Sequence, residues 1–260
     1  MTTERDLLSR LQTKAMTRFK ASAIHLLISA SVVSVIFTLI FFIWYPPPTF
    51  LIAGEFSVVW VLIGVGLIPG PLLTLIVYKQ DKPGLRFDLG VIAIIQLAAL
   101  VYGTFTLYQE RPYYMVFVVD RLNIVAEKSI DKSKLRFDAL QQKPFANLIR
   151  VFARMPEGDE FQAFLKGVIF EGQPDMELRP EYWEPYSAGE EIIRNRIRPL
   201  SELNSVTELD KRRVQEVIER HSAEHPRLGY LPIASLDKDI GMIMDMDTAE
   251  PIDYIRVDPW

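Results

Sequence analysis

The stretch from residue 21 to residue 44 reads ASAIHLLISASVVSVIFTLIFFIW and is apolar apart from His25 and several Ser and Thr residues. At about 1.5 Å per residue, a helix of this length crosses the ~30 Å hydrocarbon layer of a bilayer. A cleaved signal peptide would have a shorter apolar core and a small-residue cleavage site, whereas this run ends in Trp44-Tyr45 and three prolines. The sequence therefore predicts an uncleaved first membrane span with aromatic residues at its far end.

Two further apolar runs follow. The second, from about Phe56 to Tyr78, contains Pro69-Gly70-Pro71. Proline removes a backbone donor and kinks a helix, and in lipid the freed carbonyl groups need partners from neighbouring helices or water. The third runs from about Leu89 to Tyr108, with Asp88 placed to cap its start. We therefore expect three transmembrane helices over residues 21–110, the second of them kinked.

The basic residues of the short loops predict the orientation of these helices. Residues 1–20 carry five basic and two acidic side chains, residues 45–55 carry no basic one, and residues 79–88 carry three. The arm 1–20 and the second loop are therefore expected in the cytoplasm, and residues 111–260 on the other side, which is the periplasm in a bacterium.

The composition excludes several classes of function. The whole chain has a net charge of −4, and residues 111–260 hold 21 basic and 27 acidic residues. An acidic domain argues against nucleic-acid binding. The chain has no cysteine, which excludes disulfides, thiolate metal sites and a cysteine nucleophile.

The first half of the outer domain reads as strands followed by a helix. Tyr113–Val119 and Leu122–Ala126 are rich in β-branched and aromatic residues, and they predict a strand pair or one bent strand. Leu148–Phe152 is a further expected strand. Asp159–Phe170 has apolar residues at three- and four-residue spacing, which is typical of a helix.

The second half predicts a helix and a terminal hairpin. Ser205-Val-Thr-Glu208 matches a capping box, so we expect a helix up to about His221. Residues 240–246 alternate in hydropathy, a turn is expected at Thr248–Pro251, and Ile252–Val257 forms the last strand. The outer domain is therefore expected to be α+β, behind an α-helical membrane region with three transmembrane helices.

Two clusters could carry chemistry, and each has a simpler interpretation. His221 and His225 have the i, i+4 spacing of a zinc site, but Pro226 follows and no third ligand is marked, which favours a solvated helix end. Asp245 and Asp247 resemble a metal-binding acidic pair, but on an alternating strand they form its polar face. No catalytic motif is present, so the sequence predicts a protein that is not an enzyme and has no metal or cofactor.

The second span also offers features for binding a partner in the membrane. Its small residues allow close helix packing. Gln96 is a polar residue within the third span, and it suggests either a functional residue or a hydrogen bond between helices. The predicted partner-binding residues of the membrane region are Gly64, Gly66, Pro69, Gly70, Pro71 and Gln96.

The irregular segment Pro174–Ser187 holds a cluster of aromatic residues. Tyr182, Trp183 and Tyr186 could form an exposed protein-binding patch, because aromatic residues dominate interface hot spots. The alternative is that these rings belong to the core of the outer domain.

Seven stretches of this sequence are similar to one family. They are FKASAIHLLIS (19–29), FIWYP (42–46), IGVGLIPGPLLTL (63–75), LRFDL (85–89), IQLAALVYG (95–103), VFVVDRLNIV (116–125) and DPW (258–260). Together they resemble the type IV pilin accessory proteins of the TfpX/TfpZ kind. The resemblance is strongest over residues 18–125 and at the last three residues.

This resemblance implies a chaperone-like accessory protein of type IV pilus (fimbrium) biogenesis in the bacterial inner membrane. Such proteins assist assembly of a cognate major pilin and influence the balance of extension and retraction. The implied partners are the major type IV pilin, other inner-membrane assembly proteins and membrane lipid, and no catalytic residues are implied. The alternative is a membrane-anchored periplasmic sensor or transport-associated subunit that binds a small ligand.

Overall fold

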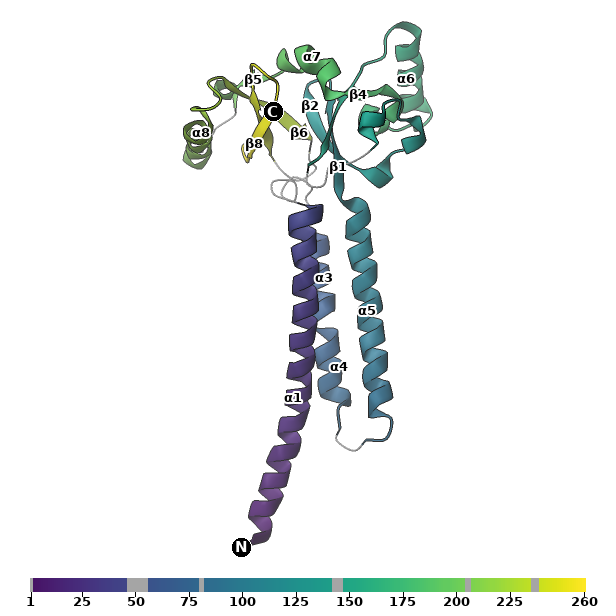
Figure 1. Ribbon diagram of the computed structural model, residues 1–260, viewed down its shortest axis with the longest axis vertical. Helices are drawn as coiled ribbons and strands as arrows, with labels where there is room; N and C mark the ends of the chain where they lie inside the picture. Colours follow the sequence, from purple (N-terminus) through teal and green to yellow (C-terminus); the bar gives the residue numbers. More distant parts are fainter. Residues whose placement is uncertain (1, 46–55, 80–81, 142–146, 204–206, 235–238) are drawn as a thin grey trace. The chain divides into compact units, whose positions relative to one another are not determined.

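A computed structural model describes residues 2–45, 56–79, 82–141, 147–203, 207–234 and 239–260 (Figure 1). The chain divides into two compact units, the first comprising Met1–Phe42 and Glu55–Tyr108 and the second Ile43–Gly54 and Gln109–Trp260. We call them the helical unit and the sheet unit. The helices of the first are α1 (Thr2–Leu39), continued by a π-helical turn at Ile40–Trp44, α3 (Phe56–Leu67), α4 (Pro69–Val77) and α5 (Leu85–Glu110).

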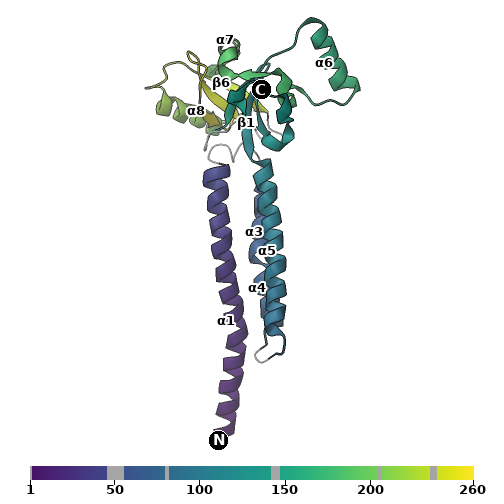
Figure 2. The same ribbon diagram turned by 45° about the vertical axis from the view of Figure 1, so that its right-hand side comes forward.

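Three stretches of the helical unit are long and apolar enough to cross a membrane, judged by length and composition: Arg18–Trp44, Val59–Val77 and Leu85–Glu110. Apolar helices in the N-terminal region were predicted and are confirmed, whereas their crossing of a membrane and its direction remain predictions. Helix α1 begins before the first of these stretches and includes the basic arm. It extends past the connection between α4 and α5 (Figures 1 and 2).

The predicted kink of the second run is present as a break between α3 and α4 at Ile68. The Ile68 N–H still donates to the Gly64 carbonyl at 3.1 Å, and the Leu72 N–H donates to the Ile68 carbonyl at 3.2 Å. Pro69 and Pro71 have no N–H to offer to the carbonyl groups four residues earlier. The helical path therefore changes over a single residue and then resumes.

The predicted cap at Asp88 is wrong. Helix α5 begins three residues earlier, at Leu85, directly after Gly84, whose φ of +81° suits glycine. Asp88 lies in the first turn of the helix, and its carboxylate accepts a hydrogen bond from Lys82 Nζ at 2.6 Å. Its negative charge near the helix N-terminus is favourable, but it does not begin the helix.

The sheet unit is built on one mixed sheet with the strand order β4-β3-β1-β2-β6-β7-β8, and β5 pairs with β6 at the side. Its helices are α6 (Gly158–Phe170), α7 (Glu190–Arg194) and α8 (Glu208–His221). The strands are β1 (Pro112–Val118), β2 (Arg121–Ala126), β3 (Ile149–Ala153), β4 (Trp183–Pro185), β5 (Arg198–Pro199), β6 (Leu228–Ala234), β7 (Gly241–Asp245) and β8 (Pro251–Ile255).

Of the two alternatives for residues 113–126, the strand pair is confirmed, and the terminal hairpin is confirmed with its turn starting two residues earlier than predicted. Strands β1 and β2 are antiparallel, with Val118 opposite Arg121. Strands β7 and β8 form the terminal hairpin, which turns over Met246–Glu250. The predicted strand near Leu148 is β3, which lies parallel to β1, and the predicted helix at Asp159–Phe170 is α6.

Both faces of the sheet are covered. Successive residues of a strand point to opposite faces, and on β1 Phe117 packs in one cluster while Val116 packs in another. The first cluster is continuous from β3 to β7 and includes Ile193 of α7. The opposite face carries two clusters, one with Phe164 of α6 and one with Val217 of α8.

This coverage corrects the expectation of a polar face on the last hairpin. All five residues of β7 are buried, because Met242 and Met244 face the cluster around α7 while Ile243 faces α8. The periodicity was real, but α8 shields its second face.

The capping box of α8 lies two residues later than predicted. Ser205 is outside the described residues, and the N-cap is Thr207, whose hydroxyl accepts from the Asp210 N–H at 3.1 Å. The Asp210 carboxylate in turn accepts from the Thr207 hydroxyl at 2.6 Å and from its N–H. The Thr207 hydroxyl bond keeps the pKa of Asp210 below its usual value.

Candidate functional site

The break between α3 and α4 is held by side chains from the other two helices. The Gln96 amide nitrogen on α5 donates to the Gly66 carbonyl and to Ser29 Oγ on α1, the latter at 3.2 Å. Ser22 Oγ, also on α1, donates to the Pro71 carbonyl at 2.9 Å. Two carbonyl groups beside the break thus receive side-chain donors, whereas the carbonyl groups that Pro69 and Pro71 leave without a backbone donor are those of Val65 and Leu67.

His25 completes this polar cluster. Its Nε2 lies 3.1 Å from the Gln96 carbonyl oxygen, and its Nδ1 lies 2.6 Å from the Thr74 hydroxyl. The amide oxygen only accepts, so Nε2 carries the proton and Thr74 donates to Nδ1 in the neutral ring. Both ring nitrogens are engaged, so the cluster ties α1, α4 and α5 together. Of the two interpretations of Gln96, the hydrogen bond between helices is confirmed.

The glycines of the second run have different surroundings. A Cβ added at Gly70 would overlap the Gln96 amide and lie 2.9 Å from His25 Nε2, and one added at Gly66 would lie 2.7 Å from Val33 Cγ2. At Gly64 it would meet open space. Gly66, Gly70 and Pro71 are buried against the other helices of this chain, whereas Pro69 is exposed. Close packing at Gly66 and Gly70 therefore serves this chain's own bundle, and binding of a partner by these residues stays a prediction.

The three aromatic residues of the predicted patch are buried. Trp183 has no exposed surface, packs edge-on against Tyr114 with ring centroids 4.9 Å apart, and donates from its indole to the Met176 carbonyl at 3.4 Å. The Tyr186 hydroxyl donates to the Ala249 carbonyl at 2.7 Å, and burial raises the pKa of this phenol. Tyr182 packs against Phe164. The burial supports the alternative that these rings are core, and partner binding by them has no support in the exposed surface.

The two histidines at the end of α8 contact different carboxylates. His221 Nε2 lies 2.9 Å from Asp253 on β8, and His225 Nδ1 lies 2.7 Å from Asp245 at the end of β7. In the described part of the chain, no three His, Cys, Asp or Glu side chains are grouped as a metal site would need. The pair therefore fastens the end of α8 to the terminal hairpin.

Asp245 is a structural residue of the hairpin turn. Its carboxylate accepts from the N–H groups of Asp247 at 2.7 Å and Thr248 at 3.0 Å, besides the His225 ring. Burial alone would raise the pKa of Asp245, but these hydrogen bonds outweigh it and hold the pKa below its usual value. Asp247 instead pairs with Arg227 at 2.6 Å. The two aspartates do not converge as a metal-binding pair would.

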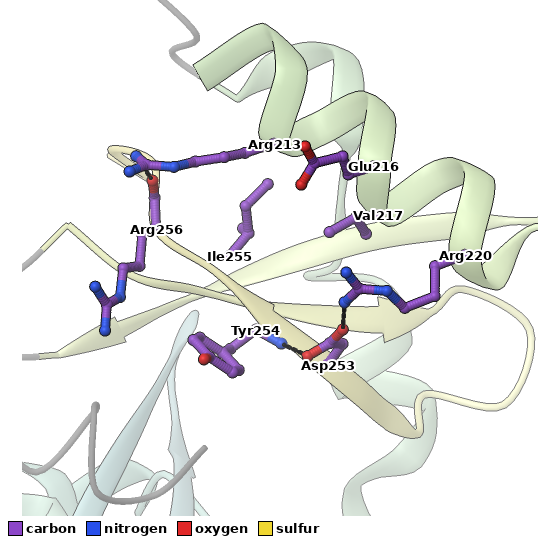
Figure 3. A pocket seen from close by; sticks show the side chains of 8 residues that line it. All are labelled: Arg213, Glu216, Val217, Arg220, Asp253, Tyr254, Ile255 and Arg256. Carbon is purple, nitrogen blue, oxygen red and sulfur yellow. Dashed lines mark hydrogen bonds and ion pairs between the residues drawn. The ribbon is translucent and has the colours of Figure 1, made fainter. Parts of the chain in front are cut away.

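A pocket of about 190 Å³ lies between α8 and β8, and Figure 3 shows its side chains. Asp253 joins its two walls, because its carboxylate accepts from Arg220 at 3.0 Å and from the Tyr254 N–H at 2.8 Å. Arg213 donates across it to the Arg256 carbonyl at 2.7 Å. Small-molecule sites usually enclose about 300–1,000 Å³, so this pocket is below that range, and three of the charged side chains that line it, Arg213, Arg220 and Asp253, make hydrogen bonds within the protein.

The sheet unit exposes large apolar side chains that sequence reasoning missed. At the end of α6, Phe170 is 80% exposed and Ile169 is 64% exposed. The helix signal was found through the opposite, buried face of α6, and Gly172, with φ +66°, ends the segment. Phe170 lies outside the apolar spacing of 161, 164, 165 and 168 and was the available signal, whereas Ile169 follows Leu165 by four residues and gave none.

Known proteins are similar to this chain over part or most of its length. The family model "Fimbrial assembly protein FimB" matches residues 13–54. The chain is 30% identical over 254 residues to "Fimbrial assembly protein, serogroup I" of Dichelobacter nodosus, which covers 92% of this chain and 96% of the relative. It is also 30% identical over 256 residues to the serogroup E1 protein of the same organism, with the same coverage.

A third relative, "Fimbrial assembly protein, serogroups C1 and C2" of Dichelobacter nodosus, is 37% identical over 113 residues, which is 43% of this chain and 86% of the relative. No solved structure matches the chain. The first two alignments extend over both units, and they confirm the resemblance that the apolar and terminal motifs indicated. The chain belongs to this family of fimbrial assembly proteins.

Proposed function

We propose that this chain is a non-enzymatic accessory protein of type IV fimbrial biogenesis that sits in the bacterial inner membrane and holds a major pilin before its assembly. The observation that carries the proposal is the similarity to fimbrial assembly proteins over 92% of the chain. Because the similarity includes the sheet unit, we expect both units to take part in fimbrial biogenesis.

The helical unit suits a partner that lies in the membrane. Its apolar side chains point outward from α1 beyond residue 18 and from α5, where Ile94 and Ile95 are among the exposed ones. The hydrogen bonds of Gln96 and His25 are made within the bundle. The surface left for a pilin helix is therefore apolar, and packing there depends on shape and van der Waals contact.

The sheet unit offers Phe170 and Ile169 as its contact with the pilin head. These two adjacent side chains are exposed apolar surface that a partner could cover, and a large aromatic side chain is a common anchor. Each contact can be weak, because two proteins confined to one membrane meet at a high effective concentration.

We also propose that the protein shifts the balance between fimbrial extension and retraction toward extension. A protein that delivers pilin to the growing base favours extension, and its loss would leave retraction dominant. In a strain that cannot retract, deletion of this protein should then leave some surface fimbriae, whereas a strict requirement in assembly would leave none.

Site-specific crosslinking tests pilin holding. A photo-crosslinking residue at position 170 should capture pilin in living cells, whereas one at Leu209, which is 57% exposed at the start of α8, should not. Equal capture at both positions, or capture at neither, would count against α6 as the contact surface. The sensor alternative gains no support from the small pocket beside α8.

A further inference from the structure

We propose that the groove between α1, α4 and α5 is a binding site for one anionic phospholipid. The groove has a volume of about 500 Å³ and is open along one side, which is within the usual range for small-molecule sites. It lies at the end of the helical unit next to the basic arm, where α4 ends and α5 begins.

The groove is polar at one end and apolar at the other. Lys20 and Tyr78 line the end of the groove near the arm. Ile28 lines the other end, eight residues further along α1, which is about 12 Å from Lys20 along the helix axis at the rise of an α-helix. Ile24 and Ile28 are 50% and 59% exposed. An anionic head at Lys20 with an acyl chain against these isoleucines matches this division.

The charge of the groove favours an anion. None of the side chains that line it in the described structure is acidic, and Lys20 is exposed. A further basic residue, Lys79, directly follows Tyr78 in the chain. Basic pockets between transmembrane helices are typical sites for anionic lipid head groups.

The groove exists because small side chains meet there. Ala21 on α1 and Ala93 on α5 both line it, and α5 is tied to α1 by the longer Gln96 side chain, which bonds to His25 and Ser29. His25 and Thr74 also line the groove but are bonded to each other at 2.6 Å. They form its inner wall, and the head group is left to Lys20 and Tyr78.

Lipid titration of the purified full chain tests the site. The chain is stripped of lipid in detergent, then titrated with phosphatidylglycerol, with phosphatidylcholine of the same acyl chains, or with inorganic phosphate. Bound lipid is counted by native mass spectrometry, and the thermal unfolding midpoint is recorded. We expect one phosphatidylglycerol per chain and a saturable rise in the midpoint, with a weaker response to phosphatidylcholine and none to phosphate.

Two variants and one matched control locate the site. Lys20→Gln should lower the apparent affinity for phosphatidylglycerol about five-fold, the equivalent of about 1 kcal/mol for one basic residue. Arg18→Gln removes the same charge about 200° around α1 and should leave the affinity unchanged. Ala93→Phe, at an exposed position, should fill the groove and abolish the saturable response.

The result can overturn the proposal in three ways. Equal responses to the two phospholipids would mean that the head-group charge is not recognised. Equal effects of Lys20→Gln and Arg18→Gln would mean attraction by the arm as a whole. A response to phosphate alone would contradict the apolar half of the site. Lipid counting does not depend on fimbriae. The phospholipid site can therefore be refuted while the proposed function holds, and the proposed function can be refuted while the phospholipid site holds.

Discussion

Gln96 on α5 donates a hydrogen bond to the carbonyl oxygen of Gly66, two residues before the break between α3 and α4. These residues are 30 positions apart, and the bond joins the end of α3, beside the break, to the middle of α5. Gln96 also contacts His25 and Ser29 on α1, so one side chain links all three apolar stretches.

Replacing Gln96 with leucine should therefore lower the free energy of unfolding of the helical unit by about 1–2 kcal/mol, because each hydrogen bond between membrane helices contributes roughly 0.6 kcal/mol and Gln96 makes three. Unfolding in mixed detergent micelles of increasing SDS content measures it. Thr104→Val is the control, because in the described structure the buried Thr104 hydroxyl has no hydrogen-bond partner, and its loss should be neutral or stabilising. Equal effects of both changes would refute the role of the Gln96 network.

Alanine at Gly70 should destabilise the same unit. Its Cβ would overlap the Gln96 amide, so either the amide moves and its hydrogen bonds weaken or the helices separate, at a cost of about 1–3 kcal/mol. Gly64→Ala is the matched control, since nothing lies within 4 Å of its added Cβ and alanine is the better helix former. SDS unfolding should rank the Gly64 variant at or above the wild type, and a Gly70 variant as stable as the Gly64 variant would contradict the packing described here.

Asp245 should make the stability of the sheet unit dependent on pH. Its folded pKa lies below its usual value, so its contribution is fully present above the unfolded pKa of about 4 and is lost as the pH falls through the folded pKa. Asp245→Asn should lower the free energy of unfolding at pH 7 by about 1–3 kcal/mol, and this difference should shrink below pH 4.

Denaturant unfolding followed by the fluorescence of buried Trp183 measures this, with the other three of the four tryptophans replaced by phenylalanine. Asp247→Asn serves as the control, because this neighbouring carboxylate is exposed and pairs only with Arg227 among the contacts found for its side chain in the described structure. A difference between wild type and Asp245→Asn that stays constant from pH 7 to pH 3 would rule out the proposed linkage.

Val119 in the β1–β2 turn should be improved by glycine. Its φ is +58°, a region that β-branched residues rarely adopt, and the Asp120 N–H donates to the Val118 carbonyl at 2.6 Å across it. Val119→Gly should raise the free energy of unfolding by about 1 kcal/mol, measured by the same fluorescence assay. Asp120→Gly should bring no gain, because Asp120 has no positive φ, and a loss of stability in Val119→Gly would refute the strain.

The helices and strands that the sequence predicted correctly depend on residues close together in the chain. The β1–β2 pair, α6 and the terminal hairpin follow from periodicity and turn residues within a dozen positions. The start of α8 was misplaced by two residues because Ser205–Glu208 and Thr207–Asp210 are overlapping capping patterns, and Thr207 is the N-cap of the helix.

Exposure could not be predicted in the same way. Trp183 and Phe170 are both large aromatic residues beside turns, yet one is fully buried and the other is 80% exposed. The difference arises because β4 pairs with β3 under α6, whereas Phe170 is on the outer side of that helix. The contact of His25 with Gln96 joins residues 71 positions apart, and neither side chain alone indicates the other as its partner.

The most direct test of the central claim is the amount of surface fimbriae sheared from a clean deletion strain, measured beside total cellular pilin. We expect the amount of surface fimbriae to fall sharply while pilin is still made, and a plasmid copy of the wild-type chain to restore it. Unchanged surface fimbriae in the deletion strain would contradict the accessory role in fimbrial assembly.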